Sequence, residues 1–287
     1  MTVESVYSGL KSQGYIPSSQ IAVSVYLSLN LQRPLLVEGD PGCGKTELAK
    51  AIAGMVGTKI FRLQCYDGLD ASSALYEWNF MKQVMELRIR QAKSDLNNIE
   101  DDLFSERFLL KRPLLNALTY SGEEQAVLLI DEIDRADEEF EGFLLEFLGE
   151  FQVTIPEIGT FRSDRPPIVV LTSNRTRELG DGLRRRCLYL YLTYPDESRE
   201  MEIVRSKLPQ AGNELIANVV GAVSRLRKSK AMIKPPGISE SILWVEAMAA
   251  MGKDKMETEA ALDTITCVAK TPEDIQEARR IMEEYFK

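Results

Sequence analysis

Histidine is absent from the 287 residues of this chain. Nucleophile systems that pair histidine with serine or cysteine are therefore excluded, as are metal sites built on imidazole. Long apolar runs are absent as well. No stretch approaches the roughly 18 uninterrupted apolar residues of a membrane-spanning helix, so we expect no membrane span. Any chemistry must rest on carboxylates, amines, amides and the backbone.

Cysteine is scarce and positive charge is in the minority. The four cysteines form no C-x-x-C pair, which fits reduced thiols in a cytosolic protein better than a disulfide framework or a zinc site. The first residues, "MTVESVYSGLKSQGY", lack the basic-then-apolar pattern of a secretion signal, so we expect a cytoplasmic location. Thirty-five basic against 44 acidic residues give a net charge of −9, which disfavours charge-driven binding to nucleic acid. The cysteines are Cys43, Cys65, Cys187 and Cys267.

Apolar runs of strand length recur in the first two thirds of the chain. They are continuous rather than alternating, as expected of strands buried on both faces of a parallel sheet, and helix-patterned segments separate them. This pattern predicts an α/β fold with a parallel five-stranded sheet between helices. The five runs are residues 33–38, 59–65, 126–131, 167–174 and 187–192.

Two segments depart from this rhythm. Residues 151–163, "FQVTIPEIGTFRS", predict a β-hairpin around "PEIG". Residues 81–112 are charged and amphipathic, with Glu86 and Arg90 spaced as an i,i+4 pair, and predict a solvated helix with a loop.

Strand patterns stop after Pro195, and five helix-patterned segments follow. The last of them begins with Thr271 as a predicted N-cap, Pro272 at the first helical position and Asp274 in the first turn. We therefore predict two domains, an α/β domain over residues 1–195 and a small all-helical domain over 196–287.

The stretch "VEGDPGCGKTELAK", residues 37–50, fits the pattern G-x-x-x-x-G-K-[ST] between a strand and a helix. Its glycines let backbone amides turn inward toward phosphate oxygens, and the helix N-terminus favours the anion. Lys45 can reach the outer phosphates, and the Thr46 hydroxyl can ligate Mg²⁺. The alternative is a glycine turn that only joins strand to helix, although a chance match has odds on the order of one in a hundred. The candidate nucleotide-binding residues are Gly39, Asp40, Pro41, Gly42, Cys43, Gly44, Lys45, Thr46 and Glu47.

Two adjacent acids end the run "AVLLIDEID". At the C-terminal edge of an open sheet, where ligands bind, Asp131 suits the Mg²⁺ shell and Glu132 can polarise the water that attacks a γ-phosphate. The alternative is a helix N-terminus rich in acids, which suits Asp134 and the run 137–139 better.

Polar and basic residues end the next two motifs. Asn174, at the tip of "PIVVLTSN", can orient the attacking water, or it can simply cap or turn the chain. Three arginines precede the last strand in "GLRRRCLYLYL", and one of them can stabilise charge on the transferred phosphoryl group of a neighbouring subunit. We predict Arg186 for that role, with Arg185 second; the alternative is a solvated basic turn or a nucleic-acid contact.

With these pieces in this order, the sequence resembles the AAA+ ATPases, specifically the MoxR family, over nearly its whole length. The resemblance lies in "RPLLVEGDPGCGKTELAKAIA", "LLIDEIDRADEEFEGFLLEFLGEFQVTIPEIG", "VVLTSN", "LRRRC" and a helical C-terminal lid. Residues 62–80, "RLQCYDGLDASSALYEWNF", resemble the branch found with carbon-monoxide-dehydrogenase maturation genes.

The resemblance implies a role for each motif. Residues 39–46 would be Walker A, Asp131 and Glu132 Walker B, Asn174 sensor 1 and Arg186 the arginine finger. It also implies a P-loop core, ATP and Mg²⁺ as cofactors, a hexameric ring, a von Willebrand A-domain partner and a metalloenzyme client. The chain would then act as a chaperone in cofactor maturation.

The same resemblance places two inserts and shows one departure. The hairpin at 151–163 would be the pre-sensor-1 insert, and residues 69–112 would hold a helix-2 insert that faces the pore and substrate. The family's sensor-2 pattern, like Gly-Ala-Ser-Pro-Arg, is "GISES" here, so Ser241 stands in place of the arginine and we assign no sensor 2. Tyr15 and Ile16 are candidate adenine contacts, or core residues.

Three functions remain open at this point. The leading hypothesis is a ring ATPase that remodels a protein client. The second is a nucleic-acid motor or clamp-loader-like ATPase, since "RRRC" resembles the arginine finger of clamp loaders. The third is a nucleotide-gated scaffold that hydrolyses too slowly to do work.

Overall fold

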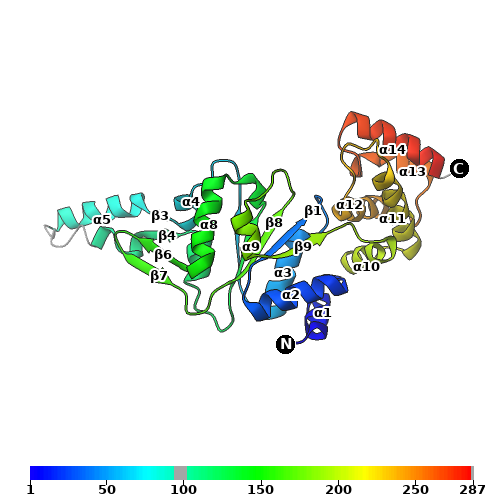
Figure 1. The fold of residues 1–287 in the computed structure, drawn as a ribbon. Coiled ribbons are helices and arrows are strands. Elements are labelled where there is room, and N and C mark those ends of the chain that lie inside the picture. The colour runs from blue at the N-terminus through cyan, green and yellow to red at the C-terminus, as the bar shows by residue number, and fades with distance from the viewer. Residues whose placement is uncertain (94–101, 286–287) are drawn as a thin grey trace. The chain divides into compact units, whose positions relative to one another are not determined.

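The computed structural model describes residues 1–93 and 102–285 (Figure 1). The chain forms two compact units of interleaved segments. Within the described ranges, no helix is both long and apolar enough to cross a membrane, as the composition predicts. A boundary between domains at residue 195 stays a prediction. The first unit comprises Met1–Val6, Ser19–Glu38 and Ala49–Leu190, and the second Tyr7–Ser18, Gly39–Leu48 and Tyr191–Lys287.

A five-stranded parallel sheet in the order β2-β5-β8-β1-β9 is the centre of the fold. Each strand lies within two residues of its predicted run, which confirms the α/β prediction. Every residue of β1 and β5 is buried, as continuous apolar runs require of strands covered on both faces. The strands are β1 Leu35–Gly39, β2 Ile60–Gln64, β5 Val127–Asp131, β8 Ile168–Ser173 and β9 Leu188–Leu192.

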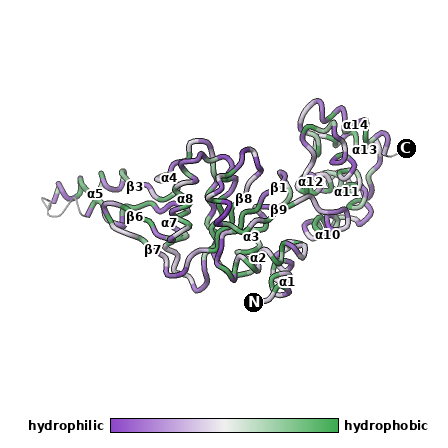
Figure 2. The backbone as a smooth tube through the Cα atoms, viewed as in Figure 1, coloured by the Kyte–Doolittle hydropathy of each residue, from purple (hydrophilic) through white to green (hydrophobic). Residues whose placement is uncertain are grey.

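Helices cover the sheet and enclose its core. Leu114 and Leu115 of α7, with Phe140 and Phe147 of α8, pack with the strands into one buried apolar cluster. Hydrophobic and hydrophilic residues alternate along the helices, as expected when one side of each is buried (Figure 2). The helices up to β9 are α1 Val3–Ser12, α2 Ser19–Leu31, α3 Lys45–Val56, α4 Ala71–Leu75, α5 Phe80–Ala92, α7 Pro113–Leu118, α8 Glu138–Glu150 and α9 Asp181–Arg186.

Two antiparallel hairpins extend the first unit. Strands β6 (Gln152–Ile155) and β7 (Gly159–Arg162) pair as the sequence predicts, with the turn at "PEIG". Strands β3 (Tyr76–Trp78) and β4 (Leu109–Lys111) form a second hairpin that the sequence did not indicate, because three residues are too few for a visible strand pattern.

The structure describes only part of the segment between β3 and β4. Helix α5 occupies Phe80–Ala92, and its predicted Glu86–Arg90 ion pair is present, with Arg90 Nε 3.1 Å from Glu86 Oε1. A 3₁₀ turn at Glu106–Phe108 precedes β4. Residues 94–101, which belong to the predicted helix-2 insert, lie outside the described residues.

After β9 the chain is helical, as predicted. Trp244 and Met282 are among the residues of a second buried apolar cluster. The N-cap of the last helix is confirmed, since the amide of Asp274 donates to Thr271 Oγ1 at 3.1 Å. The helices are α10 Glu197–Lys207, α11 Asn213–Lys228, α12 Ile238–Ala250, α13 Thr258–Asp263 and α14 Pro272–Tyr285.

Candidate nucleotide site

The glycine-rich loop runs from the end of β1 into α3. Three of its glycines have positive φ: Gly39 at 156°, Gly42 at 75° and Gly44 at 95°. A Cβ at Gly39 would lie 2.2 Å from the carbonyl oxygen of Leu192, and one at Gly42 would lie 3.1 Å from Gly237 Cα. The backbone conformation and the close neighbours both require glycine at these positions.

Lys45, the first residue of α3, is folded into this loop. Its side chain is buried, and its Nζ donates to the carbonyls of Gly39 at 2.7 Å and Asp40 at 2.9 Å. The ammonium group is therefore held by carbonyl oxygens of the loop that it would serve. Glu47 is exposed in the same first turn of α3, and its carboxylate lies 3.8 Å from Lys207 Nζ of α10.

Tyr15 borders the loop and Ile16 does not present its side chain to solvent. A Cβ at Gly44 would lie 3.7 Å from Tyr15 Cε2, and burial raises the pKa of the Tyr15 hydroxyl. Ile16 is 6% exposed, and its carbonyl accepts hydrogen bonds from the Arg199 guanidinium. Of the two candidate adenine contacts, Tyr15 is thus the one beside the loop, and Ile16 is a core residue.

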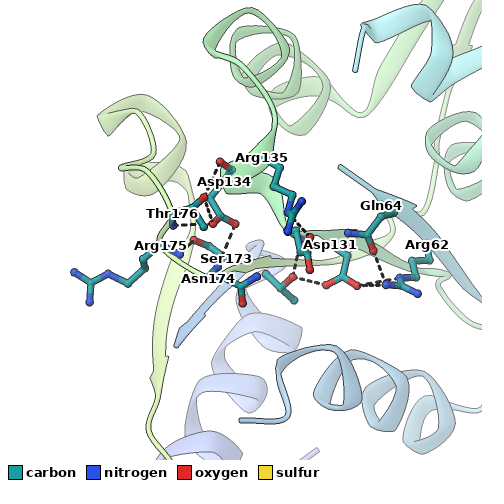
Figure 3. Close-up of polar contacts among 11 residues, drawn as sticks. Arg62, Gln64, Asp131, Asp134, Arg135, Ser173, Asn174, Arg175 and Thr176 are labelled. Carbon is teal, nitrogen blue, oxygen red and sulfur yellow. Dashed lines mark hydrogen bonds and ion pairs between the residues drawn. The ribbon is translucent and has the colours of Figure 1, made fainter. Parts of the chain in front are cut away.

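The two adjacent acids after β5 have different surroundings. Asp131 is 2% exposed; Oδ1 accepts from the Thr172 hydroxyl, and Oδ2 accepts from Arg62 Nε at 2.9 Å and Nη2 at 2.6 Å (Figure 3). Glu132 has left-handed backbone angles, φ 55° and ψ 49°, and its carboxylate pairs with Arg135 Nε at 2.7 Å. Thr172 joins both acids, since its Oγ1 also accepts the Glu132 amide at 2.9 Å.

Asn174, directly after β8, is held by a buried acid. Its backbone N–H donates to Asp134 Oδ1 at 3.1 Å. Asp134 Oδ2 also accepts from the backbone N–H and the hydroxyl of Thr176, at 2.9 and 2.7 Å (Figure 3). Burial by itself raises the pKa of Asp134, but the hydrogen bonds from Thr176 and Asn174 outweigh it and lower that pKa.

Asp134 lies in the first turn of a short 3₁₀ helix, Ile133–Arg135, where the alternative places it, but its buried carboxylate does not cap that helix. It is 3% exposed and fixes the segment after β8. Asp137 fits this alternative, because its carboxylate accepts the Phe140 amide at 2.9 Å and caps α8.

The arginines of α9 are placed differently from one another. The Arg186 guanidinium donates to the carbonyl of Leu145 on α8, whereas the Arg185 side chain is 83% exposed, with Asp181 at 3.9 Å. Arg184 lies over the Tyr189 ring, 5.7 Å from its centroid. Arg186 thus has a partner within its own chain, whereas the Arg185 side chain is largely exposed to solvent.

Ser241 occupies the position of the sensor-2 arginine in the MoxR pattern, and it lies in a buried polar network. Its hydroxyl donates to Glu200 Oε1 at 2.5 Å, and Glu200 accepts Arg227 Nη2 at 2.8 Å. The Arg227 guanidinium stacks 4.4 Å from the centroid of Tyr194, whose hydroxyl donates to the Pro41 carbonyl at 2.9 Å. Burial raises the pKa of Tyr194 to about 12, so this hydroxyl stays protonated as a donor. The network links the helical segment to the phosphate loop without an arginine at position 241.

The two residues predicted to bind Mg²⁺, one in each compact unit, both carry oxygen donors. Thr46 and Asp131 offer a hydroxyl and a carboxylate, the hard oxygen ligands that Mg²⁺ prefers. Across the two described ranges, no group of three or more His, Cys, Asp or Glu side chains could hold a metal by itself.

Three residues of this region were not singled out from the sequence: Arg62, Thr172 and Thr176. The sequence indicated Asp134 only as an acid suited to a helix start. A signal existed for Arg62, because a charged residue inside the apolar run "KIFRLQC" needs a partner. Thr172 lies in the polar strand tip "TSN", but nothing in its spacing indicates which acid it contacts.

Three curated relatives are named gas vesicle ATPases. GvpN2 of Halobacterium salinarum is 24% identical over 269 residues, which cover 89% of this chain and 74% of the relative. GvpN1 of the same organism is 25% identical over 70% of this chain, and GvpN of Haloferax mediterranei is 26% identical over 73%. The matches span 58% and 61% of the lengths of these last two relatives, which is less than two thirds.

Solved structures of RuvB from Thermotoga maritima have a similar fold. One mutant superposes with a TM-score of 0.53 at 19% identity, covering 88% of this chain and 69% of that chain. A second mutant gives 0.51 at 18% identity, covering 92% and 70%. Residues 34–187, more than half of the chain, match the family described as "AAA domain (dynein-related subfamily)". The chain belongs to this AAA family.

Proposed function

We propose that this chain is a Mg²⁺-dependent ATP hydrolase that works in an oligomeric ring to remodel a protein client. The observation that carries the proposal is the phosphate loop after β1, with three glycines at positive φ and Lys45 buried within it. Membership in the AAA family supports ATP binding and hydrolysis as the general activity.

The proposed chemistry divides among the motifs. Loop amides and Lys45 would hold the phosphates once the ammonium exchanges the carbonyls of Gly39 and Asp40 for phosphate oxygens. Thr46 and Asp131 would each offer an oxygen ligand to Mg²⁺, which would supply neutralisation of the phosphate charge.

Water activation falls to the residues at the ends of β5 and β8. Glu132 would accept the proton of the attacking water, which requires that its carboxylate leave Arg135. The Asn174 side-chain amide would orient that water, while the Asn174 backbone N–H is held by Asp134. Arg186 would stabilise the transition state of a neighbouring subunit, for which it must release the Leu145 carbonyl.

The finer identity rests on resemblance. We propose that the chain is a MoxR-type chaperone that matures a metalloenzyme. It would form a hexamer and work with a von Willebrand A-domain partner. It would belong to the branch found with carbon-monoxide-dehydrogenase maturation genes. Similarity to proteins named gas vesicle ATPases supports the ATPase activity within this proposal. A cytoplasmic location belongs to the same proposal.

The nucleic-acid motor and the slow scaffold are the competing functions. The likeness to RuvB concerns the fold alone at this identity and does not support DNA binding. A net charge of −9 argues against a nucleic-acid motor.

One experiment separates the proposal from the scaffold. The purified chain is sized with ATP, with ADP and without nucleotide, while phosphate release is measured. We expect ATP-dependent assembly with phosphate release, and neither in Lys45→Ala, because the loop then lacks its ammonium group. Assembly with ATP in the absence of phosphate release would favour the scaffold, and no effect of ATP on either measurement would refute both.

A further inference from the structure

An arginine of the edge strand holds the buried acid that ends β5. Arg62 lies on β2, two residues before Gln64, which is paired in register with Asp131. Residues two apart on a strand point to the same face, so Arg62 and Asp131 share one side of the sheet. Arg62 Nε and Nη2 both reach Asp131 Oδ2, at 2.9 and 2.6 Å (Figure 3).

The two partners differ strongly in exposure. The Asp131 side chain is 3% exposed and the Arg62 side chain 52%. A buried carboxylate is costly without a compensating charge, whereas a half-exposed guanidinium is readily hydrated after release. Breaking the pair therefore costs more free energy at Asp131 than at Arg62.

An alternative acceptor for the guanidinium lies on the same strand. Arg62 Nη2 also donates to Gln64 Oε1. If the hydrogen bonds to Asp131 break, Arg62 still donates to Gln64, and its guanidinium is hydrated by solvent. Asp131 in turn keeps the Thr172 hydroxyl on Oδ1, so its orientation persists when Oδ2 is released.

We propose that Arg62 is a resident counter-cation of Asp131 that competes with Mg²⁺ for this carboxylate and so sets the Mg²⁺ concentration at which nucleotide binds. This inference rests on the proposed function, in which Asp131 belongs to the Mg²⁺ shell. In the absence of Mg²⁺, the guanidinium neutralises the buried acid. With Mg²⁺ and a nucleotide bound, Arg62 would no longer donate to Asp131 Oδ2. It would then donate only to Gln64 and to water.

The test is the Mg²⁺ dependence of nucleotide binding, without turnover. Binding of a non-hydrolysable ATP analogue is measured by calorimetry across a series of Mg²⁺ concentrations. For Arg62→Gln, we expect the half-saturating Mg²⁺ concentration to fall about fivefold, the scale of losing one partly exposed ion pair. Arg62→Lys keeps the charge but not the two-pronged contact, so we expect a smaller fall.

Arg112→Gln is the matched control. Arg112 forms a half-exposed ion pair with Glu77 outside the candidate site, so its removal should leave the Mg²⁺ requirement unchanged. Thermal unfolding gives a second readout that tolerates a less stable variant. Without Mg²⁺ and nucleotide, Arg62→Gln should unfold at a lower temperature than the wild type, and adding both should raise its midpoint by more.

The outcomes distinguish this inference from the proposed function. If the wild type binds the analogue but Arg62→Gln has the same or a higher Mg²⁺ requirement, the competition is refuted and the ATPase proposal stands. If the wild type binds no analogue at any Mg²⁺ concentration, the ATPase proposal is refuted and this inference with it.

Discussion

The neighbouring carboxylates of Asp131 and Glu132 differ in exposure because the backbone turns at Glu132. A left-handed non-glycine residue such as Glu132 costs on the order of 1 kcal/mol or more, and the hydrogen bond that its backbone N–H donates to Thr172 Oγ1 helps to hold it there. The turn leaves Asp131 buried while the Glu132 side chain is 32% exposed. A buried acid suits a metal, and an exposed one suits contact with water.

Glu132→Gln should retain nucleotide binding but lower the rate of phosphate release at least about a hundredfold, because the amide cannot accept a proton. Calorimetry with an ATP analogue and a phosphate-release assay measure the two quantities. Glu139→Gln, an exposed acid in the first turn of α8, is the control and should behave as the wild type. Hydrolysis by Glu132→Gln at the wild-type rate would remove Glu132 from the mechanism.

Asp134→Asn should lower the free energy of unfolding at neutral pH by about 1–3 kcal/mol, since the donors of Asn174 and Thr176 lose a charged acceptor. The folded-state pKa of Asp134 is lowered, so its ionised form stabilises the protein above the unfolded pKa of about 4, and this stability is lost as pH falls through the folded pKa. The difference between wild type and variant should therefore shrink with acidification.

Urea unfolding at pH 7 and at a series of pH values below 4 measures this difference. Asp181→Asn is the control, because that side chain is 88% exposed. A difference that does not change with pH would show that the charge of Asp134 is not what stabilises the segment.

At the scale of elements, Arg186 joins α9 to α8, because its guanidinium donates to the Leu145 carbonyl. Arg186→Ala should leave nucleotide affinity largely intact and lower hydrolysis by about two or more orders of magnitude, the effect of losing an arginine finger. Arg185→Ala, on the same helix, should have a smaller effect.

Mixing tests whether Arg186 acts across an interface. Arg186→Ala keeps its own Glu132, and Glu132→Gln keeps its own Arg186, so a mixed ring would contain complete sites. We expect the mixture to recover activity that neither variant shows alone. If the mixture stays inactive, the arginine acts within its own subunit or not in hydrolysis.

The helical segment after β9 depends on the buried pair of Glu200 and Arg227, whose side chains are 1% and 10% exposed. Glu200→Gln should destabilise this segment by about 3–5 kcal/mol, because it leaves a buried guanidinium without its counter-charge. Denaturant unfolding followed by circular dichroism measures the loss. Glu197→Gln is the control: its pair with Lys228 is exposed, so we expect a change of at most about 1 kcal/mol.

At the scale of the whole molecule, the phosphate loop and the C-terminal helices belong to one compact unit. The Ile238 amide donates to the Gly42 carbonyl at 3.1 Å, and Tyr194 reaches Pro41. A nucleotide that reshapes the loop therefore acts directly on contacts of α12 and of the segment before α10. This offers a route from phosphate loss to helix movement without a sensor-2 arginine.

The net charge of −9 carries a prediction for the whole chain. Neither single-stranded nor double-stranded DNA should stimulate phosphate release, because an acidic molecule gains little from counterion release. The assay compares rates with and without each DNA between about 50 and 200 mM salt, the range over which phosphate contacts lose most of their affinity. Strong stimulation that disappears with salt would favour the nucleic-acid motor.

Features of the fold could be predicted from the sequence when the interactions that hold them join residues close together in the chain. The five strands and the N-cap at Thr271 follow from local patterns, and the structure confirms them. The β3–β4 hairpin is held by pairing between segments more than 30 residues apart, for which three-residue strands leave no local signal.

The sequence by itself determined the α/β core, the phosphate loop and the order of its polar motifs, because apolar periodicity and glycine spacing act over a few neighbouring residues. Only the tertiary structure decided which charges meet: Arg62 with Asp131, Asp134 with the Asn174 segment, and Glu200 with Arg227. Each of these contacts joins residues 27 to 69 positions apart. The energy of such a contact depends on burial and on distances of a few ångströms, which the folded chain alone specifies.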